Sequence, residues 1–122
     1  MRILYVEDNP ELRETIAMLM DGDGRTVTSC ASAEEALELD AQQNFDVLVS
    51  DVGLPGISGT DLARKLLAQD PQRWVVLCSG YELGSYPRDW GPNVRTLLKP
   101  FEVEDLEALL GSIRVAVAGS AA

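Results

Sequence analysis

The sequence predicts an α/β fold, with one parallel sheet of five strands and helices on both of its faces. Apolar runs alternate along the chain with segments whose apolar residues recur at helical spacing. The runs are continuous, which is typical of parallel strands that are covered on both faces. The length of 122 residues suits one domain with one sizeable core. We therefore expect a single domain over residues 1–118 and a frayed tail at 119–122.

The first half of the chain is expected to hold three strands and two helices. The strands are Ile3–Val6, Thr26–Cys30 and Val47–Ser50. The first helix opens at Asn9–Pro10 and ends at Gly22 and Gly24. Its apolar face consists of Leu12, Ile16, Leu19 and Met20. The second helix starts at residues 32–35, where Ser32 and Glu35 have the spacing of a capping box.

The second half is expected to continue the alternation. A loop rich in glycine and proline, residues 53–59, precedes a helix that stops at Asp70–Pro71. This helix is expected to bury Leu62, Ala63, Leu66 and Leu67. Two more strands, Trp74–Cys78 and Val94–Leu98, precede a final helix over Glu102–Val117.

The segment between the last two strands departs from this regular pattern. Residues 81–92 contain two prolines and two glycines, which interrupt a full-length helix. We therefore expect a short or distorted fourth helix there. Its apolar side chains, Leu83, Tyr86 and Trp90, are expected to cover the sheet.

The composition excludes several classes of function. The net charge of -10 argues against direct binding to nucleic acid or to an anionic membrane. The chain has no histidine, so it cannot carry a Ser-His-Asp triad, a histidine-ligated zinc ion or a phosphohistidine. Cys30 and Cys78 form no CxxC motif, and we expect buried, reduced thiols. The apolar stretches are too short for a signal peptide or a membrane span, which favours a cytoplasmic protein.

Polar side chains follow four of the five predicted strands. Glu7–Asp8 follows the first strand, and Asp51 follows the third. Ser79–Gly80 follows the fourth strand, and Lys99 follows the fifth. Ligands of open α/β sheets bind in the crevice at the carboxyl ends of the strands. We therefore expect these residues to converge in one pocket.

The residue types in this pocket suggest phosphoryl transfer. Three neighbouring carboxylates cannot all stay charged and unpaired, so they predict a hard divalent cation such as Mg²⁺. Lys99 adds a balancing positive charge. These groups would make Asp51 a metal-assisted nucleophile, while Ser79 and the Gly80 amide donate hydrogen bonds to phosphoryl oxygens. The phosphodonor could bring the histidine that the chain lacks.

Each of these residues alone has a structural explanation. Asp8 could cap the first helix, Asp51 could be a turn residue, and Lys99 could lie in a surface turn. Glu7 and Ser79–Gly80 could belong to solvated loops. These explanations do not account for the shared position at the carboxyl ends of four different strands, so we interpret the residues as one site.

The full set of motifs resembles the receiver domain of two-component response regulators. The motifs are Glu7–Asp8, Asp51, Leu54–Gly59, Ser79–Gly80 and Lys99-Pro100-Phe101, and the resemblance covers essentially the whole chain. It implies a flavodoxin-like, doubly wound (βα)5 fold with the strand order 2-1-3-4-5. It also implies that Asp51 accepts a phosphoryl group from a histidine kinase or a phosphotransfer protein.

The same resemblance implies roles for the other residues of the pocket. Asp8, Asp51 and the Gly53 carbonyl would bind Mg²⁺, or Mn²⁺ in its place, and Glu7 would contribute mainly through water. The remaining members, Ser79, Gly80 and Lys99, would contact the phosphoryl group.

Two features depart from the family pattern. The position three residues before the lysine, often an aromatic residue in the family, is Thr96 here, and the fourth helix is interrupted. The output surface is therefore expected to differ, with Tyr86 and Trp90 as candidate substitutes for the aromatic switch. A subgroup of receivers paired with kinases of the general stress response is similar in lacking the aromatic residue. Tyr81, two residues after Ser79, is placed to shield the phosphoryl group from water.

We expect a signalling switch rather than an enzyme. Phosphorylation at Asp51 would change the affinity for a protein target in another chain, and the domain would be monomeric or would dimerise on phosphorylation. The start at Met1, directly before the first strand, favours a stand-alone regulator over the receiver domain of a hybrid histidine kinase.

Two other classes of protein remain as alternatives. One is an Mg²⁺-dependent phosphohydrolase resembling the haloacid dehalogenases, which require an aspartate where this chain has Gly53. The other is a flavin-binding module of similar fold, in which Glu7–Asp8 would repel the flavin phosphate.

Overall fold

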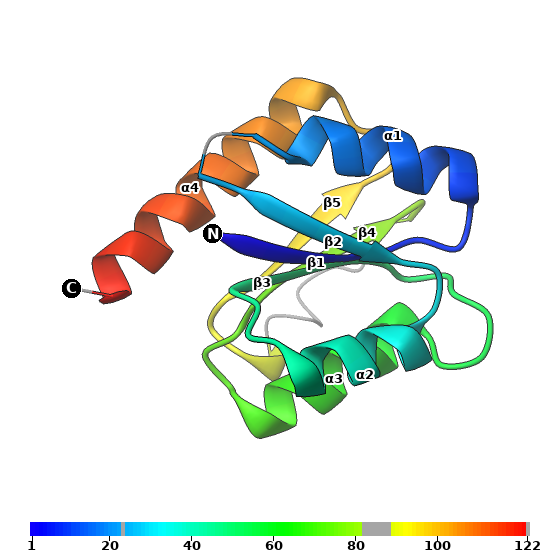
Figure 1. Ribbon diagram of the computed structural model, residues 1–122, viewed down its shortest axis with the longest axis horizontal. Coiled ribbons are helices and arrows are strands. Elements are labelled where there is room, and N and C mark those ends of the chain that lie inside the picture. The colour runs from blue at the N-terminus through cyan, green and yellow to red at the C-terminus, as the bar shows by residue number, and fades with distance from the viewer. Residues whose placement is uncertain (23, 82–88, 122) are drawn as a thin grey trace.

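A parallel sheet lies between two layers of helices (Figure 1). The computed structural model of the chain describes residues 1–22, 24–81 and 89–121. The strands are β1 (Arg2–Val6), β2 (Thr26–Cys30), β3 (Val47–Asp51), β4 (Trp74–Ser79) and β5 (Val94–Leu98). Their order in the sheet is β2-β1-β3-β4-β5, and every neighbouring pair is parallel. The predicted α/β class and strand order are confirmed.

Among the described residues, two helices cover each face of the sheet. The helices are α1 (Pro10–Met20), α2 (Ala33–Gln42), α3 (Gly59–Gln69) and α4 (Val103–Ala121). Helices α1 and α4 lie on one face, and α2 and α3 lie on the other (Figure 1). This doubly wound arrangement brings the carboxyl ends of β1, β3, β4 and β5 to one edge of the sheet.

Side-chain caps fix the starts of three helices. Asn9, Ser32 and Ser58 each accept a hydrogen bond from the backbone N–H three residues later, at 3.1, 3.2 and 3.1 Å. Such caps satisfy amide groups that the first helical turn leaves without a partner. Because Asn9 caps α1, Asp8 does not serve as the cap of that helix.

The core consists of two apolar clusters, one on each face of the sheet. Successive residues of β1 alternate between them, because side chains along a strand point to opposite faces. Beneath α2 and α3 the cluster includes Leu4, Val6, Leu48, Leu62, Leu66, Val75 and Leu77. Beneath α1 and α4 it includes Ile3, Tyr5, Val47, Val49, Val76, Leu106, Leu110 and Ile113. Burial on both faces explains why the central strands β1, β3 and β4 are continuous apolar runs in the sequence.

Two helices differ in detail from the expectation. Helix α4 continues to Ala121, four residues beyond the predicted end at Val117, and includes Gly119. Whether residues 119–122 fray stays a prediction. On α1, Met20 is buried, but Leu12 and Leu19 of the predicted apolar face are each 37% exposed.

The short or distorted fourth helix was predicted within residues 81–92. Of these, residues 82–88, which include Leu83 and Tyr86, lie outside the described residues. Trp90 is described and half-buried against the core beneath α3, as expected. The Arg64 guanidinium lies 5.5 Å from the centre of the Trp90 ring.

The sequence also predicts two properties that concern the whole chain. Cys30 and Cys78 are both buried, as predicted, and neither forms a disulfide in the described structure. Within residues 1–22, 24–81 and 89–121, none of the helices combines the length and the apolarity that crossing a membrane requires.

Candidate functional site

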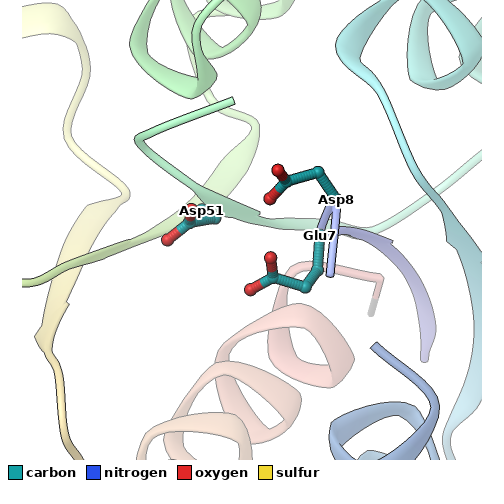
Figure 2. Close-up of side chains that lie close together, drawn as sticks. All are labelled: Glu7, Asp8 and Asp51. Atoms are coloured by element: carbon teal, nitrogen blue, oxygen red, sulfur yellow. The ribbon is translucent and has the colours of Figure 1, made fainter. Parts of the chain in front are cut away.

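Three carboxylates meet at the carboxyl ends of β1 and β3. Glu7, Asp8 and Asp51 each offer an oxygen that lies within 4.8 Å of the other two (Figure 2). The two strands are direct neighbours in the sheet, so the residues at their ends lie side by side. Glu7 is buried at 2% exposure, Asp51 is half-buried and Asp8 is exposed. The predicted convergence of the acidic residues is therefore observed.

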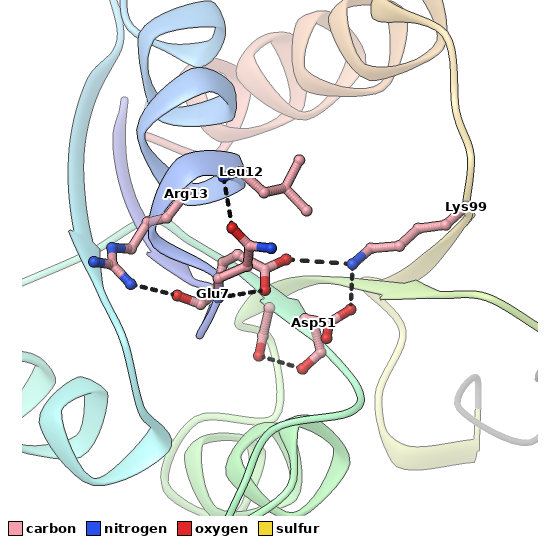
Figure 3. A network of polar contacts seen from close by, with 7 residues as sticks. Glu7, Leu12, Arg13, Asp51 and Lys99 are labelled. Carbon is pink, nitrogen blue, oxygen red and sulfur yellow. Dashed lines mark hydrogen bonds and ion pairs between the residues drawn. The ribbon is translucent and has the colours of Figure 1, made fainter.

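Lys99 joins this cluster from the end of β5. Its Nζ lies 2.6 Å from Oδ1 of Asp51 and 3.3 Å from Oε1 of Glu7 (Figure 3). Burial acts to lower the pKa of Lys99, but the hydrogen bond and charge of Asp51, together with Glu7, outweigh it and raise the pKa. The ammonium is therefore charged at neutral pH, and one positive charge faces three carboxylates.

Glu7 is held by groups at the start of α1. The backbone N–H of Asn9 donates to Glu7 Oε2 at 3.1 Å, and Arg13 Nη1 donates to the Glu7 carbonyl at 2.8 Å (Figure 3). Burial raises the pKa of the Glu7 carboxyl, against the effects of the Asn9 hydrogen bond and of Lys99. The fold therefore keeps Glu7 where its negative charge is costly unless positive charge is close by.

Close packing at the start of α3 fixes the backbone of Asp51. A Cβ at Gly59 would overlap with the Asp51 carbonyl oxygen, so only glycine permits this approach of the helix to β3. The Ser50 hydroxyl donates to the same carbonyl at 3.0 Å. Val52, which follows Asp51, is hydrogen-bonded to β4: its backbone N–H donates to the Cys78 carbonyl at 3.0 Å.

Gly53 lies close to the Asp51 side chain. A Cβ at Gly53 would come within 3.8 Å of Asp51 Oδ2, which is an ordinary contact distance. The loop that contains Gly53 forms a hydrogen bond with α2: the Ile57 N–H donates to Glu34 Oε1 at 3.3 Å. The backbone of Gly53 is thus at the edge of the carboxylate cluster.

Ser79 ends β4 beside the cluster, but its hydroxyl bonds elsewhere. It donates to the Tyr81 carbonyl at 2.7 Å and accepts from the Tyr81 N–H at 3.1 Å. The hydroxyl is therefore held within its own loop rather than on Asp51. A Cβ at Gly80 would meet no atom within 4 Å, which leaves space beside this loop. Tyr81 itself is 63% exposed.

The donor set of the cluster fits a hard divalent cation. Three carboxylates and one ammonium leave a local net charge of about two negative units, and oxygen donors of this kind are those that Mg²⁺ prefers. Burial raises the pKa of the neighbouring Cys78 thiol to about 12, which favours the protonated form at neutral pH.

A cavity of about 350 Å³ adjoins the cluster, between the sheet, α1 and the segment that leads into α4. Its residues are Tyr5, Glu7, Leu12, Ile16, Asp51, Cys78, Lys99, Pro100 and Phe101. Burial, and then the charge of Glu7, raise the pKa of Tyr5, so its phenol is neutral at physiological pH.

Residues 3–111 match the response regulator receiver domain family, and the chain belongs to this family. It is therefore a phosphoacceptor domain of two-component signalling, a class whose members interact with histidine kinases or phosphotransfer proteins and with downstream targets. The phosphohydrolase alternative is not favoured. The acidic cluster agrees with the Mg²⁺ sites of this class.

Two curated relatives illustrate this membership. The two-component response regulator PhoP of Pseudomonas aeruginosa is 32% identical over 121 residues, covering 93% of this chain and 51% of that protein. The response regulator receiver protein CpdR of Brucella abortus is 28% identical over 111 residues, covering 86% of this chain and 89% of that protein. The chain spans about half of the length of two of the curated relatives that it matches, and a quarter or less of the length of two others.

Solved structures give the same fold. The receiver domain of the hybrid histidine kinase CckA is 33% identical, with a TM-score of 0.77 over 93% of this chain and 99% of that chain. The response regulator TrrA of Thermotoga maritima, in complex with Mg²⁺ and BeF, is 24% identical, with a TM-score of 0.81 over 92% of this chain and 97% of that chain. The likeness to TrrA concerns the fold.

Several supporting residues were not found from the sequence. Arg13 and Ser50 hold the backbone of Glu7 and Asp51, and no motif marks them, because their contacts depend on where the helix and the strand lie. In the sequence Gly59 stands out only as part of a loop motif. Its position directly after the helix cap Ser58 is the signal that indicates a close approach of the helix start to the sheet. Thr96 is exposed on the edge strand β5.

Proposed function

We propose that Asp51 is the residue that accepts the phosphoryl group, from a histidine kinase or a phosphotransfer protein. The observation that carries this proposal is the 2.6 Å contact between Asp51 and Lys99. Asp51 combines this contact with partial exposure, whereas Glu7 is almost fully buried. A nucleophile must be reached by the donor and must also lie beside positive charge that offsets the charge of the transferring group.

The chemistry would proceed by attack of an Asp51 carboxylate oxygen on the phosphorus of the donor phosphohistidine. The new O–P bond forms, the P–N bond breaks, and the leaving imidazole takes a proton from solvent. Lys99 would neutralise negative charge on the phosphoryl oxygens. Gly80 N–H and the Ser79 hydroxyl would donate hydrogen bonds to the same group once the hydroxyl leaves the Tyr81 carbonyl.

The reaction would require a divalent cation held by Asp8, Asp51 and the Gly53 carbonyl, with Glu7 acting through water. Mg²⁺ is the expected ion, and Mn²⁺ would substitute because it shares the preference for oxygen ligands. The bound ion supplies charge neutralisation for phosphoryl transfer. The excess of carboxylates over ammonium groups in the cluster supports this part of the proposal.

Intact-mass spectrometry tests the proposal. The protein should gain one labile phosphoryl group when it is incubated with Mg²⁺ and acetyl phosphate, and EDTA should prevent the gain. Asp51→Asn should gain none, while Glu38→Gln, which changes an exposed acid on α2, should behave as the unmodified chain does. A phosphoryl group on the Asp51→Asn protein would contradict the choice of acceptor, and a gain in EDTA would contradict the need for a metal ion.

The proposal extends to the role of the domain. Residues 1–118 would act as a cytoplasmic switch that turns over only its own phosphoryl group, as a monomer or as a dimer that forms on phosphorylation. Phosphorylation would alter its affinity for a protein target in another chain. The net charge of -10 supports a protein target over direct contact with nucleic acid.

A further inference from the structure

The cavity at the carboxylate cluster has the size of a small-molecule pocket. Glu7, Asp51 and Lys99 form its charged end, and the proposed phosphoryl transfer does not use its apolar part. Its volume of about 350 Å³ falls near the lower end of the range of about 300–1,000 Å³ for ligand pockets. Leu12, Ile16 and Phe101 give it apolar walls. Walls of this kind favour a ligand with an apolar body.

Tyr5 supplies one polar group that lacks an internal partner. The residue is 4% exposed and lines the cavity. Within the described part of the chain, the Tyr5 hydroxyl forms no hydrogen bond. Every described side-chain nitrogen or oxygen that is completely buried does have a hydrogen-bond partner, so the Tyr5 hydroxyl is not completely buried. The hydroxyl therefore borders the open space of the cavity, where a ligand can form a hydrogen bond with it.

The charged end of the cavity restricts the ligand further. Glu7 and Asp51 are both paired with Lys99, at 3.3 and 2.6 Å, and together the three carry a net negative charge. An anionic ligand would be repelled, and its burial there would be costly. A neutral ligand with a hydrogen-bond donor is favoured, since the acceptors at this end are carboxylates and a phenol.

We propose that this cavity is a binding site for a neutral, largely apolar small molecule that carries one hydrogen-bond donor. The apolar body lies between Leu12, Ile16 and Phe101, and the donor binds the hydroxyl oxygen of Tyr5. The proposal does not rest on the proposed phosphoryl transfer, although Asp51 and Lys99 belong to both sites, so its test does not require a phosphodonor.

Indole is a suitable probe, because it is neutral and apolar and has a single N–H donor. Titrated into ¹⁵N-labelled protein, it should shift the backbone amide signals of Leu12, Ile16 and Phe101 in a saturable manner. N-Methylindole, which lacks the donor, should bind roughly five- to tenfold more weakly, as expected for one lost hydrogen bond. In Tyr5→Phe the two probes should bind with equal affinity.

Matched variants on α1 locate the site. Ile16→Phe fills the cavity and should abolish saturable indole binding, whereas Met18→Phe places the same side chain at a position that is 73% exposed and should leave binding unchanged. The absence of saturable shifts in the unmodified protein would overturn the proposal. Equal affinity in Ile16→Phe and in the unmodified protein would do so too. Equal affinity of the unmodified protein for the two probes would overturn the role of Tyr5, whether or not Tyr5→Phe folds.

Discussion

Lys99 links two carboxylates that would otherwise repel each other. Its Nζ lies 2.6 Å from Asp51 and 3.3 Å from Glu7, and Glu7 is almost completely buried. Removing one partner from such a buried arrangement costs far more than breaking an exposed ion pair, because a charge is left without compensation. A divalent cation at the same cluster would provide part of the same compensation, so the effects of Lys99 and of metal ions on stability are coupled.

The two cysteine thiols are expected to be unreactive in the folded protein. Burial raises the pKa of Cys30 to about 11 and that of Cys78 to about 12. Because the thiolate is the reactive form, roughly one Cys30 thiol in a thousand would be charged at pH 8. Ellman's reagent at pH 8 should therefore label both thiols rapidly in denaturant and neither rapidly in the native protein. Fast labelling of the native protein would contradict this expectation.

Tyr81 is expected to prolong the phosphorylated state. Its exposed ring follows Ser79 by two residues, where it would obstruct water that approaches the phosphoryl group in line. Tyr81→Ala should shorten the lifetime of the phosphorylated protein, followed by intact mass after the donor is removed. Tyr81→Phe keeps the ring and should keep the lifetime. The shielding role is wrong if the alanine variant loses its phosphoryl group at the unmodified rate.

The start of helix α3 depends on one glycine. Gly59→Ala should lower the free energy of unfolding by about 2–4 kcal/mol, since its Cβ would overlap with the Asp51 carbonyl. Gly111→Ala is the matched control, because a Cβ in that part of α4 meets no atom within 4 Å. It should stabilise the protein by up to about 1 kcal/mol through helix propensity. Urea denaturation measures both changes, and equal effects would contradict the close packing at Gly59.

Helix α4 is linked to the segment before β2 by an ion pair. Arg25 Nη1 lies 2.9 Å from Glu107 Oε2, and its hydrogen bond holds the pKa of Glu107 below the usual value. The pair therefore stabilises the fold above the ordinary pKa of 4.5, and this contribution is lost as the pH falls through the lowered pKa. The effect should be small and should decrease with added salt, because the Glu107 side chain is 42% exposed.

A substitution of Glu107 tests this pH dependence. Glu107→Gln should reduce the free energy of unfolding at pH 7 and should have no effect at low pH, where the glutamate is protonated as well. In an Arg25→Gln background the same substitution should cause no loss at either pH. A loss that persists at low pH would show that the side chain acts through packing rather than through its charge.

The elements themselves could be predicted well from the sequence. β2 and β5 have the predicted bounds, because each is a short β-rich run between clear turn residues. The predicted cap at Ser32 is present, since side-chain capping is a local interaction. The end of α4 and the exposure of Leu12 were not predicted. The end of α4 depends on how far that helix extends beyond the sheet. The exposure of Leu12 depends on how α1 is rotated relative to the sheet that it covers.

The strand order of the whole molecule explains why the site forms. β1, β3, β4 and β5 are consecutive neighbours in the sheet. β2 lies outside this group, beyond β1, and contributes no residue to the acidic cluster or to the lysine contact. The carboxyl ends of these four strands therefore lie on the same side of the sheet (Figure 1). This convergence was predictable, since it requires only that the strands lie side by side. The cavity behind the site was not, because its shape depends on how α1 and the start of α4 lie against the sheet.

The location of the phosphoryl group is the most informative single measurement on this protein. After phosphorylation with acetyl phosphate and Mg²⁺, sodium borohydride reduces an aspartyl phosphate to homoserine, and peptide mass spectrometry locates the converted residue. We expect conversion at Asp51 alone, with Glu7 and Asp8 unchanged. Conversion at Asp8 or at another acidic residue, or a phosphorylated protein with no converted aspartate, would contradict Asp51 as the phosphoacceptor.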